Sequence, residues 1–104
     1  MDRLPMLRQL AQARPGDPFP RYGLAMELRK RGEDGQVEAV AVFESLLADH
    51  PGYVPTYLMY GTLLRERGEP ARAAQVLVRG IEAARTAGDD HALGELEAAR
   101  AELP

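Results

Sequence analysis

Cysteine is absent from the 104 residues, so the chain can form neither a disulfide nor a thiolate metal site. Asparagine is also absent, and a single lysine stands beside twelve arginines. No uninterrupted apolar run approaches the roughly 18 residues that a membrane-spanning helix needs. The first residues lack the basic start and the apolar core of a secretory signal peptide. These absences exclude a disulfide scaffold, predict no membrane partner and favour a cytoplasmic protein.

Side chains that carry catalysis or bind metals are few and scattered. His50 and His91 are forty-one residues apart and match no local metal-ligand spacing such as HExxH. Ser45 is the only serine, and it lies inside a predicted helix without a neighbouring base. No glycine-rich pattern for binding phosphate occurs. We therefore predict no catalytic residue, no metal and no cofactor, and structural roles for both histidines.

Charge is distributed unevenly along the chain, although the net charge is only -3. Residues 1–32 carry seven basic and three acidic side chains, a balance of +4. Residues 33–69 have a balance of -5, and residues 70–104 one of -2. Such a distribution can orient a partner or join protomers head to tail, and it is equally compatible with a solvated surface.

Three tyrosines, Tyr53, Tyr57 and Tyr60, lie close together in the sequence. Aromatic side chains stack on bases where they face a basic groove. These tyrosines belong to the acidic middle of the chain, and helix packing already accounts for two of them. We therefore predict no nucleic-acid partner.

The most informative feature of the chain is an internal repeat. An apolar pair, a leucine and a closing glycine recur thirty-six residues apart, as Leu24-Ala25, Leu28 and Gly32 and then as Tyr60-Gly61, Leu64 and Gly68. A second set recurs thirty-four residues apart, as Ala39, Phe43 and Leu46 and then as Ala73, Leu77 and Gly80. A fainter echo precedes them in Leu7, Leu10 and Pro15. A period near thirty-four is typical of stacked two-helix units.

Proline, glycine and aspartate mark the ends of six predicted helices. These helices span about residues 3–14, 18–31, 36–50, 55–67, 70–87 and, from Asp89 or Asp90, to 103. Asp2 and Asp17 are the expected N-caps of the first two, and Gly32 is placed to end the second. Residues 32–35 form a predicted turn, two residues longer than its later counterpart. The pattern predicts an all-α fold, a short right-handed α-solenoid of antiparallel helix hairpins.

The repeated residues resemble the tetratricopeptide repeat. That family pairs a large residue with glycine or alanine in the first helix of each hairpin. It places alanine, an aromatic residue or leucine, and alanine in the second helix, before a closing proline. The resemblance implies one domain over residues 1–104, divided into an N-terminal helix (1–16), a first repeat (18–53), a second repeat (54–87) and a C-terminal capping helix (88–104).

Two departures from the family pattern stand out. Arg21 occupies the place that Tyr57 has in the second unit. Arg85 replaces the closing proline, which predicts a fifth helix longer than the third.

The resemblance also implies a binding surface, because tetratricopeptide arrays hold a peptide or a helix on a concave face lined by the first helix of each hairpin. The matching positions are Tyr22, Met26, Arg29, Leu58, Thr62 and Arg65. The arginines would provide forks suited to carboxylates. Alternatively, the first or the sixth helix covers this surface. The family's carboxylate clamp for chaperone tails uses lysine and asparagine, and this chain has Tyr22 and Met26 there, so we do not expect chaperone-tail binding.

The sequence thus predicts a non-enzymatic protein-interaction module whose concave groove binds a peptide or a helix of a partner. The alternative is a self-associating assembly subunit, in which the groove or an end face packs against another protomer. A homo-oligomer is therefore a second possible form of the protein.

Overall fold

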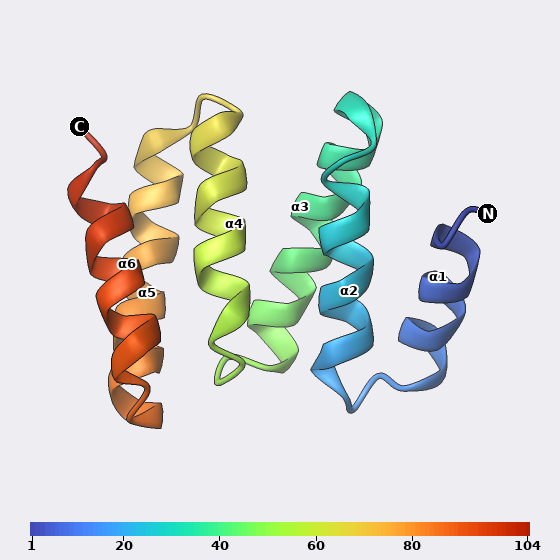
Figure 1. The fold of residues 1–104 in the computed structure, drawn as a ribbon, viewed down its shortest axis with the longest axis horizontal. Coiled ribbons are helices and arrows are strands. Elements are labelled where there is room, and N and C mark those ends of the chain that lie inside the picture. Colours follow the sequence, from blue (N-terminus) through green and yellow to red (C-terminus); the bar gives the residue numbers. More distant parts are fainter. The chain divides into compact units, whose positions relative to one another are not determined.

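The computed structural model describes all 104 residues and contains six α-helices and no strand (Figure 1). The helices are α1 (Leu4–Ala13), α2 (Pro18–Leu28), α3 (Gly32–Asp49), α4 (Pro55–Glu66), α5 (Pro70–Ala87) and α6 (Asp90–Ala101). The chain forms two compact units, an N-terminal unit (residues 1–50) and a C-terminal unit (residues 51–104). No helix is both long enough and apolar enough to span a membrane. The predicted all-α class is confirmed.

Aspartate side chains start α2 and α6, as the sequence predicts. The Asp17 carboxylate accepts a hydrogen bond from the backbone N–H of Phe19 at 3.0 Å, and Pro18 fits the first helical turn. Asp89 accepts from the backbone N–H of Ala92 at 3.0 Å. Gly88 ends α5 with φ 68°, a left-handed conformation that favours glycine. Local chemistry therefore fixes these helix ends.

The predicted turn at residues 32–35 is wrong, because these residues form the first turn of α3. Gly32 still separates α2 from α3 with φ 69°. Gly35 is buried, and a Cβ there would lie 2.4 Å from the Leu28 carbonyl oxygen. Only glycine allows the start of α3 to approach the end of α2 so closely.

The predicted difference in length between the third and fifth helices is also wrong, since α3 and α5 both have 18 residues. Without the closing proline, α5 continues through Arg85 to Ala87, as expected. Before Pro51, α3 ends at Asp49, but it gains a turn at its N-terminus. The extension of α5 at its C-terminus and that of α3 at its N-terminus leave the two helices equal in length.

In the N-terminal unit, α2 packs against both α1 and α3. Its core consists of buried apolar side chains, all but Leu47 at repeat positions: Leu7, Leu24, Ala25, Leu28, Ala39, Phe43, Leu46 and Leu47. Arg8 of α1 forms two hydrogen bonds with the carboxylate of Glu38 in α3. Arg31 binds Asp2 at 2.6 Å and Glu27 at 3.1 Å. Apolar packing and ion pairs therefore both hold α1 in place.

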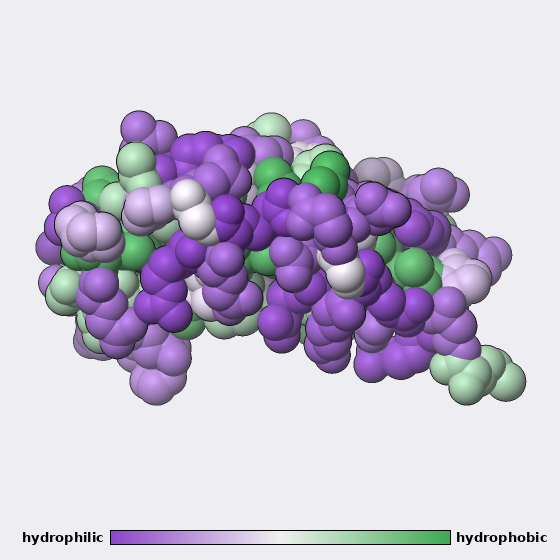
Figure 2. All heavy atoms as spheres, turned by 90° about the horizontal axis from the view of Figure 1, so that it is seen from above, coloured by the Kyte–Doolittle hydropathy of each residue, from purple (hydrophilic) through white to green (hydrophobic).

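In the C-terminal unit, α4, α5 and α6 each pack against the other two. A Cβ at Gly61 would lie 2.7 Å from the Leu77 side chain, and a Cβ at Gly80 would lie 2.5 Å from that of Tyr57. The small residues of the repeat thus allow α4 and α5 to pack closely. On the face shown in Figure 2, hydrophilic residues predominate and hydrophobic residues form small separate groups.

Candidate functional site

Tyr22, Met26 and Arg29, here called the α2 face, lie on one side of α2 because they are three or four residues apart. All three side chains are half-buried. The Nε of Arg29 is buried and has no hydrogen-bond partner. The guanidinium of Arg29 also forms no ion pair. The α2 face therefore combines an apolar part with an uncommitted cation.

Three other arginines of the N-terminal unit, Arg8, Arg21 and Arg31, form ion pairs. Arg21 binds Asp49 at 2.7 Å, and its side chain is 14% exposed. The hydrogen bonds from Arg8 lower the pKa of Glu38, and the hydrogen bond from Arg31 lowers the pKa of Asp2. These pairs hold the unit together, and they leave Arg29 as the cation of the α2 face that is available to a carboxylate.

Leu58, Thr62 and Arg65, here called the α4 face, occupy the matching positions on α4. Leu58 and Thr62 are half-buried, and Arg65 is exposed. The Thr62 hydroxyl donates to the Leu58 carbonyl oxygen at 2.7 Å, within the helix. Arg65 donates to the carboxylate of Glu102 at 2.9 Å. Unlike Arg29, Arg65 already has an acidic partner.

Helix α6 lies against part of the α4 face. A cavity of only about 10 Å³ remains where Thr62 and Arg65 meet Ala99 and Leu103. In the C-terminal unit, the sixth helix therefore covers part of this face, which the sequence left open as an alternative. The side chains of the α2 face and the α4 face belong to different units, and each face is complete on its own helix.

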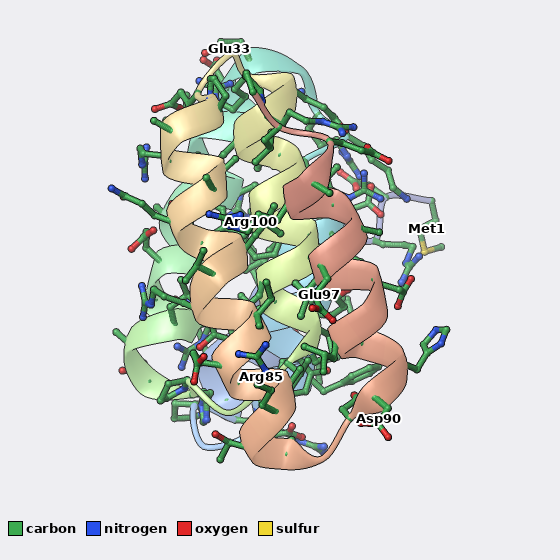
Figure 3. All side chains as sticks on the ribbon, turned by 90° about the vertical axis from the view of Figure 1, so that its left-hand side faces the viewer. Met1, Glu33, Arg85, Asp90, Glu97 and Arg100 are labelled. Atoms are coloured by element: carbon green, nitrogen blue, oxygen red, sulfur yellow. The ribbon has the colours of Figure 1, made fainter.

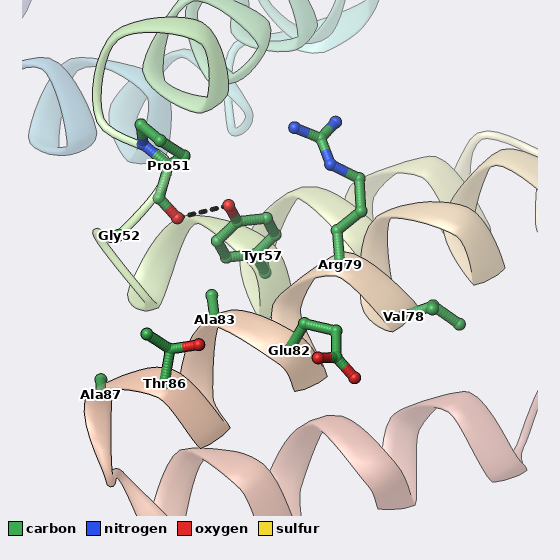
Figure 4. A pocket seen from close by; sticks show the side chains of 9 residues that line it. All are labelled: Pro51, Gly52, Tyr57, Val78, Arg79, Glu82, Ala83, Thr86 and Ala87. Carbon is green, nitrogen blue, oxygen red and sulfur yellow. Dashed lines mark hydrogen bonds between the residues drawn. The ribbon is translucent and has the colours of Figure 1, made fainter.

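A shallow pocket of about 670 Å³ on the C-terminal unit was not predicted from the sequence (Figure 4). It lies between the outer side of α5 and the turn at Pro51 and Gly52. The Tyr57 hydroxyl donates to the Pro51 carbonyl oxygen at one side of it, and burial raises the pKa of Tyr57. Val78, whose side chain is 42% exposed, is one of its lining residues.

The two histidines and Ser45 each contact a neighbouring group of the protein. The Nε2 of His50 lies 3.0 Å from the Pro15 carbonyl oxygen, and His91 lies 3.3 Å from Glu95 on the surface. The Ser45 hydroxyl donates to the Val42 carbonyl oxygen at 2.7 Å. No group of three or more histidine, aspartate or glutamate side chains is arranged to hold a metal ion.

Comparisons with known proteins agree with this geometry. The family described as tetratricopeptide repeat matches residues 37–93. The solution NMR structure of a tetratricopeptide repeat domain protein from Salinibacter ruber has 39% sequence identity and a TM-score of 0.78, covering 85% of this chain and 87% of that one. A crystal structure of such a protein from the same organism has 38% identity and a TM-score of 0.76, covering 83% and 94%.

No curated protein matches the chain. The match to the family and the similarity to the two solved structures nevertheless confirm the predicted resemblance. The helical hairpins, with small residues at their close contacts, are those expected of such repeats. This chain therefore belongs to the tetratricopeptide repeat family.

Proposed function

We propose that the chain is a non-enzymatic protein-interaction module that binds an acidic peptide or helix of a partner protein. Members of the family generally mediate protein–protein interactions. A fold alone does not define a function, so the proposal depends on particular side chains. The observation that carries it is the state of Arg29.

Arg29 supports recognition of a carboxylate. Its buried Nε has no hydrogen-bond partner, and leaving a buried donor unpaired is unfavourable. A guanidinium binds a carboxylate through two parallel hydrogen bonds, and the two terminal nitrogens of this half-buried side chain, which are not buried, remain free to form them. Tyr22 and Met26, both half-buried, provide apolar surface beside it for the rest of the peptide.

On the α4 face, Arg65 would bind a second acidic group of the partner only by leaving Glu102. Their ion pair at 2.9 Å is exposed, and such pairs contribute about 0–1 kcal/mol. Exchange of Glu102 for a carboxylate of the partner therefore costs little. Because each face is small, we expect a dissociation constant in the micromolar range.

The test compares the wild-type chain with Met26→Ala/Arg29→Ala and Leu58→Ala/Arg65→Ala variants in pull-downs analysed by mass spectrometry. We expect a partner that the wild type captures and both double variants lose, because each variant removes apolar contact and a cation. Arg85→Ala is the matched control, since it removes an exposed arginine paired with Glu82 at 3.1 Å. Circular dichroism must show that all variants remain helical.

Once that partner is identified, Glu102→Ala provides a sharper check. Removing the competing carboxylate should strengthen binding, whereas Arg65→Ala should weaken it. If folded double variants retain the partner, the binding surface lies elsewhere on the chain.

Self-association is a second candidate function. It is favoured by Met6 and Leu10, two large apolar side chains on α1 that are 52% and 37% exposed. Their four-residue spacing places them on one side of the helix.

A further inference from the structure

We propose that copies of the chain associate head to tail, with the exposed side of α1 in one copy packed against α6 of the next. The proposal rests on self-association, the second candidate function, and names the surfaces and the partner. The partner is a second copy of this chain. Binding of an acidic peptide through Arg29 is a separate interaction.

The first observation concerns α1, which carries the same repeat pattern as α3 and α5. Leu10 corresponds to Leu46 in α3 and to Gly80 in α5, both of which are buried. Met6 corresponds to Val42 in α3, which is half-buried, and to Val76 in α5, which is 6% exposed. At these positions α1 instead leaves two large apolar side chains in contact with solvent. The side of α1 that bears Met6 and Leu10 is therefore suited to packing against another helix.

The second observation concerns Gly94 in the middle of α6. Leu93-Gly94 echoes Tyr60-Gly61, and a Cβ at Gly61 would lie 2.7 Å from the Leu77 side chain of the paired helix. A Cβ at Gly94 would meet no atom within 4 Å. A helix is less stable with glycine than with alanine in its interior. Gly94 therefore destabilises α6 without allowing a close helix contact within the isolated chain. A second helix packed there would supply that contact.

The surface beside α6 is suited to another helix. A hollow of about 470 Å³ lies between α5 and α6, and its lining combines small and apolar side chains with two arginines at its border: Ala74, Gln75, Val78, Arg79 and Arg100. Figure 3 looks onto these two helices and shows Asp90, Glu97 and Arg100 along α6. The hollow provides apolar surface for Met6 and Leu10 of the second copy.

Charge complementarity selects a second copy as the occupant. Asp90 and Glu97 of α6 form no ion pair, and neither do Arg3 and Arg14 beside α1. In the α4–α5 hairpin the paired helices are antiparallel (Figure 1). The same arrangement of α1 on α6, with Arg14 beside Asp90, brings Leu10 level with Gly94 and Arg3 level with Ala101, about 6 Å beyond Glu97. Arg14 and Asp90 therefore form the pair of opposite charges in this contact.

The two surfaces differ, so the contact is heterologous. Each copy keeps one free α1 side and one free α6 side after pairing, and association therefore continues to a ring or an open chain. One short helix buries little surface, so we expect association that rises with protein concentration.

The test is sedimentation velocity over a series of protein concentrations. The wild type should exceed the 11.4 kDa of one chain as its concentration rises. The Met6→Glu/Leu10→Glu variant and the Gly94→Arg variant should each remain a single chain. The matched control is Val37→Glu, which places the same charge at a 54% exposed valine of α3 and should associate as the wild type does.

Mixing the two single-chain variants is the decisive measurement. Each retains one intact surface, so their equimolar mixture should form a species of two chains and nothing larger. Gly94→Arg replaces a helical glycine that no atom contacts, and circular dichroism should show that both variants remain folded.

The alternative outcomes overturn different claims. If the wild type associates and the variants associate equally, the α1–α6 contact is wrong and self-association stands. If the mixture stays at one chain, the head-to-tail pairing is wrong. If the wild type remains a single chain at every concentration, the pairing and the second candidate function both fail, and binding of a peptide through Arg29 is unaffected.

Discussion

Arg21 and Tyr57 occupy the same place in the two repeat units and bind the same kind of backbone group. Arg21 donates to the Pro15 carbonyl oxygen at 3.1 Å, and Tyr57 donates to the Pro51 carbonyl oxygen. Each acceptor lies six residues before its donor. The sequence marks this position as a departure from the repeat, but the structure gives both side chains one role, the fixing of the turn that precedes the helix.

Glycines in the C-terminal unit allow a prediction at the same scale. Gly80→Ala should lower the free energy of unfolding by about 1–3 kcal/mol, because its Cβ would lie 2.5 Å from the Tyr57 Cβ and cannot be accommodated by a flexible side-chain end. Gly94→Ala should raise it by about 0.5–1 kcal/mol, because the new methyl group meets no atom and alanine favours a helix.

Urea denaturation followed by circular dichroism measures both changes, at a protein concentration low enough to prevent association. The two variants make the same chemical change in neighbouring helices, so each serves as the control for the other. Equal effects would contradict the packing described for Gly80.

At the scale of helices, α3 and α5 share one repeat pattern but begin and end at different positions of it. Pro51 follows α3 closely, whereas Arg85 allows α5 to continue past the corresponding position. Gly35 allows α3 to begin a turn earlier, against the end of α2. The end of α3 is predicted by the proline that follows it in the sequence. The early start of α3 depends on contact between two helices, which the sequence pattern does not specify, and for this reason the predicted turn at residues 32–35 is wrong.

The attachment of α1 should depend on acidity. Hydrogen bonds from Arg8 and Arg31 lower the pKa values of Glu38 and Asp2, so the folded state binds protons at these groups less readily than the unfolded state. The stability they contribute is present above their ordinary pKa values of 4.5 and 3.8, and it is lost as pH falls below them. We therefore expect stability to fall as pH drops below about 4.5.

Urea midpoints measured at several pH values between neutrality and strong acid test this expectation. Arg8→Gln is the control, because it removes the cation that lowers the pKa of Glu38 and leaves the carboxyl group in place. Its stability should fall less over the same pH range. The same pH dependence in both proteins would show that the Arg8–Glu38 pair does not stabilise α1.

At the scale of the whole molecule, the effect of the uneven charge distribution depends on which charged side chains are paired within the chain. Residues 1–32 have a balance of +4, but Arg8, Arg21 and Arg31 are engaged in ion pairs within the N-terminal unit. Arg29 is left to bind an external carboxylate, and Arg14 is left for Asp90 in α6 of a second copy.

Salt should therefore weaken head-to-tail association. The Debye length falls from about 10 Å at 0.1 M to about 3 Å at 1 M, which screens attraction between exposed charges. Sedimentation velocity at fixed protein concentration should show a smaller mean mass as salt increases.

Charge reversal identifies the pair that salt screens. Arg14→Asp should reduce association, and adding Asp90→Arg in the same chain should restore it, because opposite charges again face each other. Association that strengthens with salt, or that the double variant fails to regain, would contradict the pairing of these two residues.

Some features of the candidate site can be predicted from the sequence, and others are seen only in the structure. The helical spacing of Tyr22, Met26 and Arg29 can be read from the repeat, because residues three or four apart share a helix side. The ion pair of Arg65 with Glu102, thirty-seven residues later, has no such signal. Nor does the hollow beside Val78, since its walls come from separate helices.

The sequence by itself determined the six helices, their caps at Asp17 and Asp89, the repeat and the family, because these depend on interactions between residues close together in the chain. Tertiary structure alone decided which helix sides are covered. It left Met6 and Leu10 exposed, engaged Arg65 and left Arg29 unpaired. The physical reason is that burial and pairing depend on which helices meet in space, and periodicity within one helix does not specify its neighbours.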